Sequence, residues 1–317
     1  MSFKIIVVGL LMGAAEVVPG VSGGTIAFVS GYYERLIDGI SRLTPMQLFR
    51  LPKLGLRAWW TEIDGNFLAL LFGAMGVSIL LLARGVSYLL EHEPVLIWSF
   101  FLGLVLASIV VVAKSLKLRQ LETPLAIGVG AALGLIVTQL IPLEANISPL
   151  VLFAGGCIAV CAWILPGLSG SFILLVLGLY TSVIDAIKLL DVVTLFWVAL
   201  GCVAGLMSFS RVLSYLLSHF HNLTVSVLVG FMLGSLPRIW PWKHTTSYQI
   251  KADGGQVPVV QEPVLPETYQ ALTGYSPDLL LALVSLIAGI GLIVILDRFA
   301  FYHQDTNRQS ETVGDDD

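Results

Sequence analysis

The sequence predicts an all-α polytopic membrane protein with two inverted repeats, each a Pro-Gly-broken re-entrant helical hairpin followed by three transmembrane helices. Three observations predict this fold class. Only 17 basic and 21 acidic residues occur among 317, the mean hydropathy is +0.89, and a 22-residue segment recurs 147 residues later with 11 identities. Soluble domains carry roughly 25% charged residues, about twice the fraction found here. The composition therefore excludes an ordinary soluble enzyme.

Single spans are indicated by runs without Asp, Glu, Lys or Arg, because a spanning helix needs about 20 apolar residues. A charge at the centre of such a helix costs about 3 kcal/mol. In the first repeat, residues 1–143, these runs predict spans at 65–83, 94–113 and 123–143. In the second repeat, residues 144–299, they predict spans at 192–210, 222–237 and 278–297, with an outer loop at 238–277.

Two regions, 3–40 and 147–187, do not fit single spans and predict hairpins. The second contains forty residues without a charge, which as one helix would be about twice as long as the hydrocarbon core is thick. Each region has a Pro-Gly pair at its centre, followed by a serine that can cap a new helix. Lys4 and Pro19 are only 15 residues apart, about 22 Å of helix. Arms this short favour re-entrant hairpins over pairs of full spans.

The internal repeat predicts the orientation of the chain. If each hairpin returns to its starting side, the three spans of the first repeat carry the chain across, and the second repeat is inverted. With the N-terminus inside, twelve Lys and Arg residues face the cytoplasm and five lie outside, as the positive-inside rule requires. Both chain ends are then cytoplasmic.

Three segments outside the spans receive their own predictions. Residues 45–60, an insert in the first repeat with three basic residues and two tryptophans, predict an interfacial helix. Residues 257–266 of the outer loop predict extended chain in a small hairpin over the outer mouth. Residues 300–317, which end in three aspartates, predict a disordered cytoplasmic tail.

The two Pro-Gly turns are the candidate substrate site. After each turn a helix begins, and its unpaired amides and positive dipole end can bind an anion. We expect the turns to lie near each other inside the bilayer. The other interpretation is structural, with serine capping its own helix and glycine permitting the turn. The candidate binding residues are Glu16, Pro19, Gly20, Ser22, Gly23, Gly24, Thr25, Pro166, Gly167, Ser169, Gly170 and Ser171.

Glu16 is the one carboxylate beside a turn, since Trp163 occupies its position in the second repeat. An ionisable group inside a membrane is a functional hypothesis by default. Because loss of water favours the neutral acid, a proton-coupled role follows as a hypothesis. The alternative is a structural ion pair with Arg35 or Arg84.

Arg84 and Arg211 are repeat equivalents at the ends of predicted spans, and inversion puts them at opposite membrane faces. A guanidinium there can hold a lipid phosphate with two hydrogen bonds. The alternative is that each side chain extends to the lipid head groups without a specific ligand. Arg35 is the third candidate phosphate guide.

The sequence lacks the patterns that are typical of other function classes. A basic stripe with interleaved aromatics is absent, which argues against a nucleic-acid partner. The three cysteines lie in apolar runs, so neither a disulfide framework nor a thiolate metal site is predicted. We predict no catalytic residue, metal or cofactor.

The run from Gly13 to Thr25 with Gly31 to Leu36, and its echo from Leu165 to Ser171 with Gly178 to Tyr180, resembles the polyprenyl-phosphate transporter (PopT) family. The resemblance covers roughly residues 3–300. It implies a bacterial inner-membrane protein that returns undecaprenyl phosphate, the lipid carrier of cell-wall precursors, from the outer to the inner leaflet. The family usually has Asp where this chain has Glu16, so the carboxylate is kept.

Two rival functions remain open. The first is a membrane phosphatase that acts on undecaprenyl pyrophosphate, since such enzymes also look like inverted hairpins. They have an Arg where this chain has Gly23 and Gly170, and a paired-glutamate motif for metal that this chain lacks. The second rival is a transporter of a small anionic solute, since a helix-end site recognises any anion.

Overall fold

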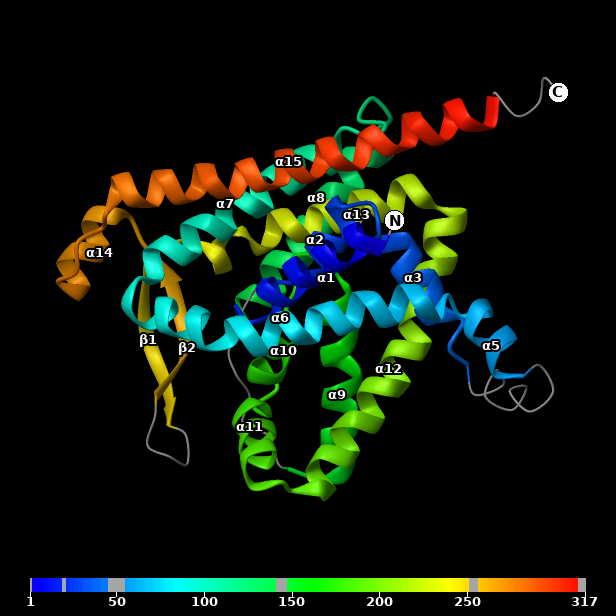
Figure 1. Cartoon of the computed structure of the whole chain (residues 1–317). Helices are drawn as coiled ribbons and strands as arrows, with labels where there is room; N and C mark the ends of the chain where they lie inside the picture. Colours follow the sequence, from blue (N-terminus) through cyan, green and yellow to red (C-terminus); the bar gives the residue numbers. More distant parts are fainter. Residues whose placement is uncertain (1, 19–20, 45–54, 141–146, 251–255, 313–317) are drawn as a thin grey trace.

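The computed structural model describes residues 2–18, 21–44, 55–140, 147–250 and 256–312. These parts are mostly helical, with one two-stranded sheet among them (Figure 1). Five helices are long and apolar enough to cross a membrane, or six if the bent pair α10 (Gly170–Val176) and α11 (Tyr180–Leu189) forms one span. The chain is therefore an all-α multi-pass membrane protein, as the sequence predicts.

The first hairpin contains three helices, α1 (Ser2–Glu16), α2 (Gly23–Val29) and α3 (Tyr33–Ser41). The Pro-Gly turn separates α1 from α2. A second break, which the sequence pattern did not predict, separates α2 from α3 at Gly31, whose φ is +74°. Glycine adopts this left-handed conformation without a steric penalty. The return arm is thus two short helices and not one.

The second hairpin repeats this arrangement with α9 (Pro149–Ile164), α10 and α11. Gly178, the repeat equivalent of Gly31, has a φ of +69°, and the axes of α10 and α11 differ by 110°. The residues before α2 and α10 agree closely, since Ser22 has φ −114° and ψ 130° and Ser169 has φ −114° and ψ 128°. The duplicated sequence therefore folds into duplicated local structure.

The longer helices also recur. In the first repeat they are α6 (Gly65–His92), α7 (Pro94–Ala113) and α8 (Glu122–Thr138); in the second they are α12 (Val192–His219), α13 (His221–Ser235) and α15 (Leu279–Thr312). A short 3-10 helix, η1 (Leu236–Ile239), follows α13. Helices α6 and α12 continue beyond residues 83 and 210, where the charge-free runs predict the spans to end. Arg84 and Arg211 lie inside these helices, from which a long side chain can still reach the lipid head groups.

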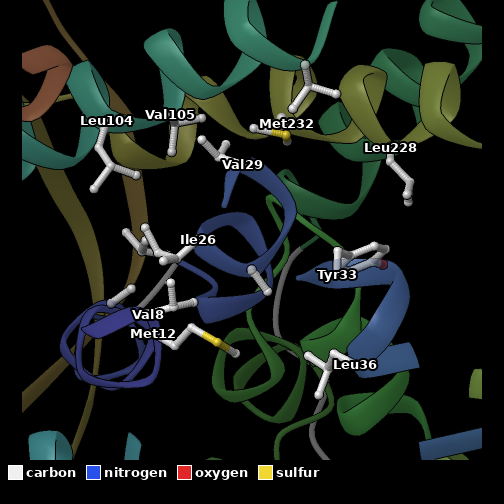
Figure 2. Close-up of a cluster of buried hydrophobic side chains, with 14 of the residues drawn as sticks. Val8, Met12, Ile26, Val29, Tyr33, Leu36, Leu104, Val105, Leu228 and Met232 are labelled. Carbon is white, nitrogen blue, oxygen red and sulfur yellow. The ribbon is translucent and has the colours of Figure 1, made fainter. Parts of the chain in front are cut away.

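Helix α2 lies in the centre of the hydrophobic core. Figure 2 shows Ile26 above Val8 and Met12 of α1, and Val29 beside Val105 of α7 and Met232 of α13. Ile26, Met12 and Met232 are at most 1% exposed. Helix α2, which follows the first Pro-Gly pair, is therefore anchored by apolar contacts to helices of both repeats.

Helices α8 and α13, one from each repeat, pack with their backbones in close contact. A Cβ atom at Gly130 would lie 2.2 Å from the Val227 carbonyl oxygen, and one at Gly230 would lie 2.3 Å from the Ile127 carbonyl oxygen. Small residues permit this approach, which is common between helices in membranes. Helices α7 and α15 run along each other in the same way (Figure 1).

The outer loop folds into β1 (Lys243–Ile250), antiparallel to β2 (Gln256–Pro263), and then α14 (Pro266–Thr273). The expected hairpin is confirmed, although the sequence pattern predicted only its second strand. The indole nitrogens of Trp240 and Trp242 donate to the carbonyl oxygens of Val264 and Pro277, at 2.9 Å each. These bonds attach the segment to the end of α13.

Two other segments outside the spans can be compared with their predictions. The insert contains α5 (Leu56–Glu62), which has no buried residue and a 67% exposed Leu56; residues 45–54 lie outside the described residues. Where a disordered tail from residue 300 was predicted, α15 continues to Thr312. Between residues 292 and 312 no Pro or Gly interrupts the helix. Residues 313–317 are outside the described part.

Candidate functional site

The segment that follows the first Pro-Gly pair, residues 21–25, meets the second Pro-Gly turn in the structure. The Gly167 amide of the second turn donates to the Thr25 hydroxyl oxygen at 3.1 Å. The Ser22 hydroxyl donates to the Trp163 carbonyl oxygen, also at 3.1 Å. A Cβ atom at Gly24 would lie 2.8 Å from the Ile164 carbonyl oxygen, so the backbones are in direct contact. The expectation that the turns lie close together is confirmed.

Gly167 requires a special backbone conformation at this contact. Its φ is +86°, and a Cβ atom there would lie 2.8 Å from the Met232 Cα atom of α13. An L side chain would be strained by the φ value and would also collide with backbone. The second turn is thus held between the first turn and α13.

Several described amides of the first turn have protein acceptors. The Gly23 amide donates to the Glu16 carboxylate at 2.6 Å, and the Gly24 amide donates to the Ser22 hydroxyl oxygen at 3.1 Å. Ser22 and Thr25 are at most 1% exposed. Most of the polar groups of this turn are therefore occupied by protein partners, as the structural interpretation of the motif predicts.

The second turn differs, because Trp163 stands where the first repeat has Glu16. Ser169 precedes α10 but makes no capping hydrogen bond; its hydroxyl pairs instead with the Ser171 hydroxyl, at 2.9 Å. In the described part of the chain the amides of Gly170 and Ser171 have no protein acceptor. Two amides and the one hydroxyl hydrogen not used between Ser169 and Ser171 are thus available to an incoming acceptor at this turn.

Glu16 lies at the junction of the repeats. Its carboxylate accepts from the Gly23 amide, and the Trp163 side chain lies within electrostatic reach of that carboxylate. The two repeat-equivalent residues are therefore close to each other. The alternative ion pair with Arg35 is wrong, because Arg35 pairs with Asp64. Among the described residues, no cation pairs with Glu16.

The three candidate arginines lie apart from one another. Arg35 donates twice to Asp64, at 2.6 and 3.0 Å, and its guanidinium carbon lies 4.3 Å from the centre of the Phe67 ring. Arg211 donates to the Ser41 carbonyl oxygen at 3.5 Å. Arg84 lies on α6. No hydrogen bond or ion pair within the described ranges joins any of the three to either turn.

Pro19 and Gly20 lie outside the described residues, so their predicted part in the site stays a prediction. Pro166 is buried in the second turn.

Two further residues at the site were not predicted from the sequence. The Tyr33 hydroxyl donates to the Ile164 carbonyl oxygen at 3.1 Å and so links the repeats. The Arg238 guanidinium carbon lies 4.4 Å from the ring of Phe172 in α10. Two features of the sequence could have pointed to them: Tyr33 is identical to its equivalent in the second repeat, and Arg238 lies close to a tryptophan in the sequence.

The described residues contain no group of three His, Cys, Asp or Glu side chains that could hold a metal ion. The chemistry on offer at the turns is therefore hydrogen-bond donation from amides and hydroxyls beside one carboxylate. Such a set can bind an oxyanion and release it again.

A family model described as undecaprenyl phosphate translocase-like (VCA0040-like) matches residues 12–257, which include both turns. The chain belongs to this family. A polyprenyl-phosphate transporter of Vibrio cholerae serotype O1 is 43% identical over 292 residues, covering 92% of this chain and 95% of the relative. A polyprenyl-phosphate transporter of Staphylococcus aureus is 30% identical over 257 residues, covering 74% and 84%. No solved structure matches the chain.

Proposed function

We propose that the protein translocates undecaprenyl phosphate across the bacterial inner membrane and returns it from the outer to the inner leaflet. Membership of the family and the names of its two relatives support a polyprenyl phosphate as the substrate. The helices that are long and apolar enough to cross a membrane agree with a lipid substrate. A phosphate head needs a polar path, whereas the prenyl tail can remain in lipid.

In this proposal the phosphate head binds at the paired turns. The observation that carries it is the set of donors without a protein acceptor at the second turn in the described part of the chain. These are the amides of Gly170 and Ser171, and the one O–H of the Ser169–Ser171 hydroxyl pair that does not donate within the pair. A phosphate monoester offers three acceptor oxygens, which suit several converging donors. The first turn, fastened through Thr25, supports the second and supplies Glu16 nearby.

Glu16 makes the proposed cycle proton-coupled. An ionised carboxylate beside a phosphate anion repels it, whereas a protonated one does not. The Glu16 carboxyl can keep its bond from the Gly23 amide in both forms, since a protonated acid still has an accepting oxygen. Proton uptake would therefore favour head-group binding without disturbing the turn.

The orientation has the N- and C-termini in the cytoplasm, with the two repeats inverted. Arg84 and Arg211 then lie near opposite faces and guide the phosphate into and out of the protein. Arg35 has a supporting role, because its ion pair with Asp64 joins α3 to the start of α6.

The test is reconstitution of the purified protein in vesicles that carry polyprenyl phosphate in one leaflet. We expect protein-dependent movement of the phosphorylated lipid, no movement of the uncharged polyprenol, and no release of inorganic phosphate from polyprenyl pyrophosphate. Release of phosphate would indicate a phosphatase. Uptake of soluble phosphate without lipid movement would indicate a transporter of small anions.

A further inference from the structure

A buried lysine, Lys243, and a partly buried arginine, Arg238, lie together after α13. Lys243 is 8% exposed, and its ammonium group donates to the Arg238 carbonyl oxygen at 2.9 Å. The same nitrogen lies 3.1 Å from the centre of the Trp98 ring in α7. The Arg238 guanidinium lies over the ring of Phe172 in α10. Each cation thus contacts an aromatic ring, one from each repeat.

The pair has no counter-charge in the described part of the chain, where no carboxylate lies within ion-pairing distance of Arg238 or Lys243. Burial of cations without an anion is costly, and aromatic faces compensate only in part. Burial, together with the nearby Arg238 guanidinium, lowers the pKa of the Lys243 ammonium well below its usual value. The Arg238 side chain has five N–H donors, and none is bonded to a protein acceptor within the described ranges.

The pair lies beside the second turn. Gly167 packs against Met232 and Ser235, which precede Arg238 by less than two helical turns. Phe172, under the guanidinium, belongs to the first turn of α10. An anion held by this pair would therefore be adjacent to the donors of the second turn.

The pair has no counterpart in the first repeat. At the repeat offset of 127 that relates α7 to α13, the equivalent residues are Val111 and Leu116, both apolar. The duplicated framework therefore does not require the cations, and they occur at one mouth of the protein. In the predicted orientation that mouth is the outer one.

We infer that Arg238 and Lys243 form an anion-binding site for a phosphate monoester at the outer mouth of the second turn. Two cations match the charge of the phosphate, and the planar guanidinium can donate two parallel hydrogen bonds to it. The inference rests on the proposed function in one respect, that the phosphate is the head group of the transported lipid. The site then captures the head group before it reaches the turns.

A purely structural role makes opposite predictions. If the cations only attach the β1–β2 hairpin to the membrane helices, their removal weakens the fold and leaves ligand binding unchanged. If they form an anion site, an apolar residue of similar length removes a desolvation cost from the ligand-free protein. Lys243→Met should then unfold at the same or a higher temperature than the wild type.

The experiment measures binding to the purified full-length protein in detergent, with a short-chain polyprenyl phosphate, the matching polyprenol and inorganic phosphate as probes. The variants are Arg238→Gln, Lys243→Met and the double variant. Lys114→Gln is the matched control, because Lys114 is an exposed cation just beyond the other end of α7. We expect each single variant to bind polyprenyl phosphate about tenfold more weakly, in line with the loss of one charge-assisted contact. The double variant should lose more affinity for polyprenyl phosphate, and the control variant should bind it as tightly as the wild type.

The outcomes separate this site from the proposed function. If the wild type binds and moves polyprenyl phosphate and the double variant binds it equally well, the inference is overturned and the proposed function stands. A Lys243→Met protein that is less stable without ligand but binds normally would also overturn it. If the wild type neither binds nor moves the lipid, the proposed function fails. The wild type could instead bind inorganic phosphate as tightly as the lipid, with the variants losing affinity for both to the same extent. In that case the anion site stands and its ligand is the free anion.

Discussion

At the residue scale, the difference between Glu16 and Trp163 distinguishes the two turns. These residues occupy equivalent positions in the repeats, yet one supplies a carboxylate to the Gly23 amide and the other leaves the Gly170 amide without a protein acceptor in the described part of the chain. If the two turns were equivalent, the amides of both would have protein acceptors or those of neither would. The substitution at one position therefore creates one turn that anchors and one that can bind.

Glu16→Gln tests the proton-coupled role. Glutamine keeps an oxygen that can accept from the Gly23 amide, so the turn should stay folded, but it cannot take up a proton. We expect the variant to retain the thermal stability of the wild type and to show a flat pH profile of lipid translocation in vesicles. A variant with the same pH dependence as the wild type would exclude Glu16 as the proton carrier.

Gly167→Ala tests the close approach of the second turn to α13. The strain of a positive φ alone costs about 1 kcal/mol, and the contact with the Met232 backbone adds to it. Gly31→Ala is the matched control, because Gly31 also has a positive φ but no atom within 4 Å of the place where a Cβ would lie. Thermal unfolding should show a larger loss for Gly167→Ala. Equal losses would mean that the approach to α13 does not constrain the turn.

At the element scale, the starts of the long helices were predictable and several of the ends were not. Gly65, Pro94 and Val192 begin helices where the charge-free runs begin. The runs end at Arg84 and Arg211, but the helices continue, because a flexible side chain lets an arginine remain inside a helix near the membrane surface. Charge marks where a side chain needs water, whereas hydrogen bonding of the backbone decides where a helix ends.

The short helices α2 and α10 show a second limit of sequence reasoning. Gly31 and Gly178 were visible as identities in the repeat, but a lone glycine in an apolar run does not reveal a turn. The structure uses both in a positive-φ conformation to divide the return arms. The pairing of the two Pro-Gly turns was predictable from the duplication. The difference in their hydrogen bonding was not, because it depends on contacts between residues far apart in the chain.

Gly130→Ala tests the packing of α8 against α13. The added methyl would meet the Val227 carbonyl oxygen, so the helices must separate, at a cost of about 1–3 kcal/mol. Gly128→Ala on the same helix has nothing within 4 Å of its Cβ position and should be neutral or slightly stabilising, since alanine favours helix. We expect only Gly130→Ala to lower the unfolding temperature in detergent. The opposite order would contradict the close backbone contact.

At the scale of the whole molecule, the two repeats pack differently. Helix α3 lies along α12, where Arg211 donates to the Ser41 carbonyl oxygen. The equivalent helices, α11 and α6, have no such packing in the described part of the chain, and α11 instead contacts α12. In a transporter with inverted repeats, exchange of two such packings opens the opposite face. If the repeats are inverted as we propose, the protein has a second state in which α11 packs on α6.

The second state can be detected by cross-linking. The repeat equivalents of Ser41 and Arg211 are Lys188 and Arg84, which should approach each other when α11 packs on α6. We expect the double variant Arg84→Cys/Lys188→Cys to react with a short bifunctional maleimide, and polyprenyl phosphate to change the yield. The pair Ser41→Cys/Arg211→Cys should change in the opposite direction. Yields that rise and fall together would argue against an exchange of packings.

The central claim is that the second of two meeting turns binds the phosphate head of a lipid that the protein carries across the membrane. Its most direct test is the initial rate of polyprenyl phosphate translocation in vesicles containing either the wild type or the double variant Ser169→Ala/Ser171→Ala. We expect the wild type to accelerate translocation over protein-free vesicles and the variant, equally well folded, to lose most of that acceleration. A wild type no faster than protein-free vesicles, or a variant as fast as the wild type, would contradict the claim.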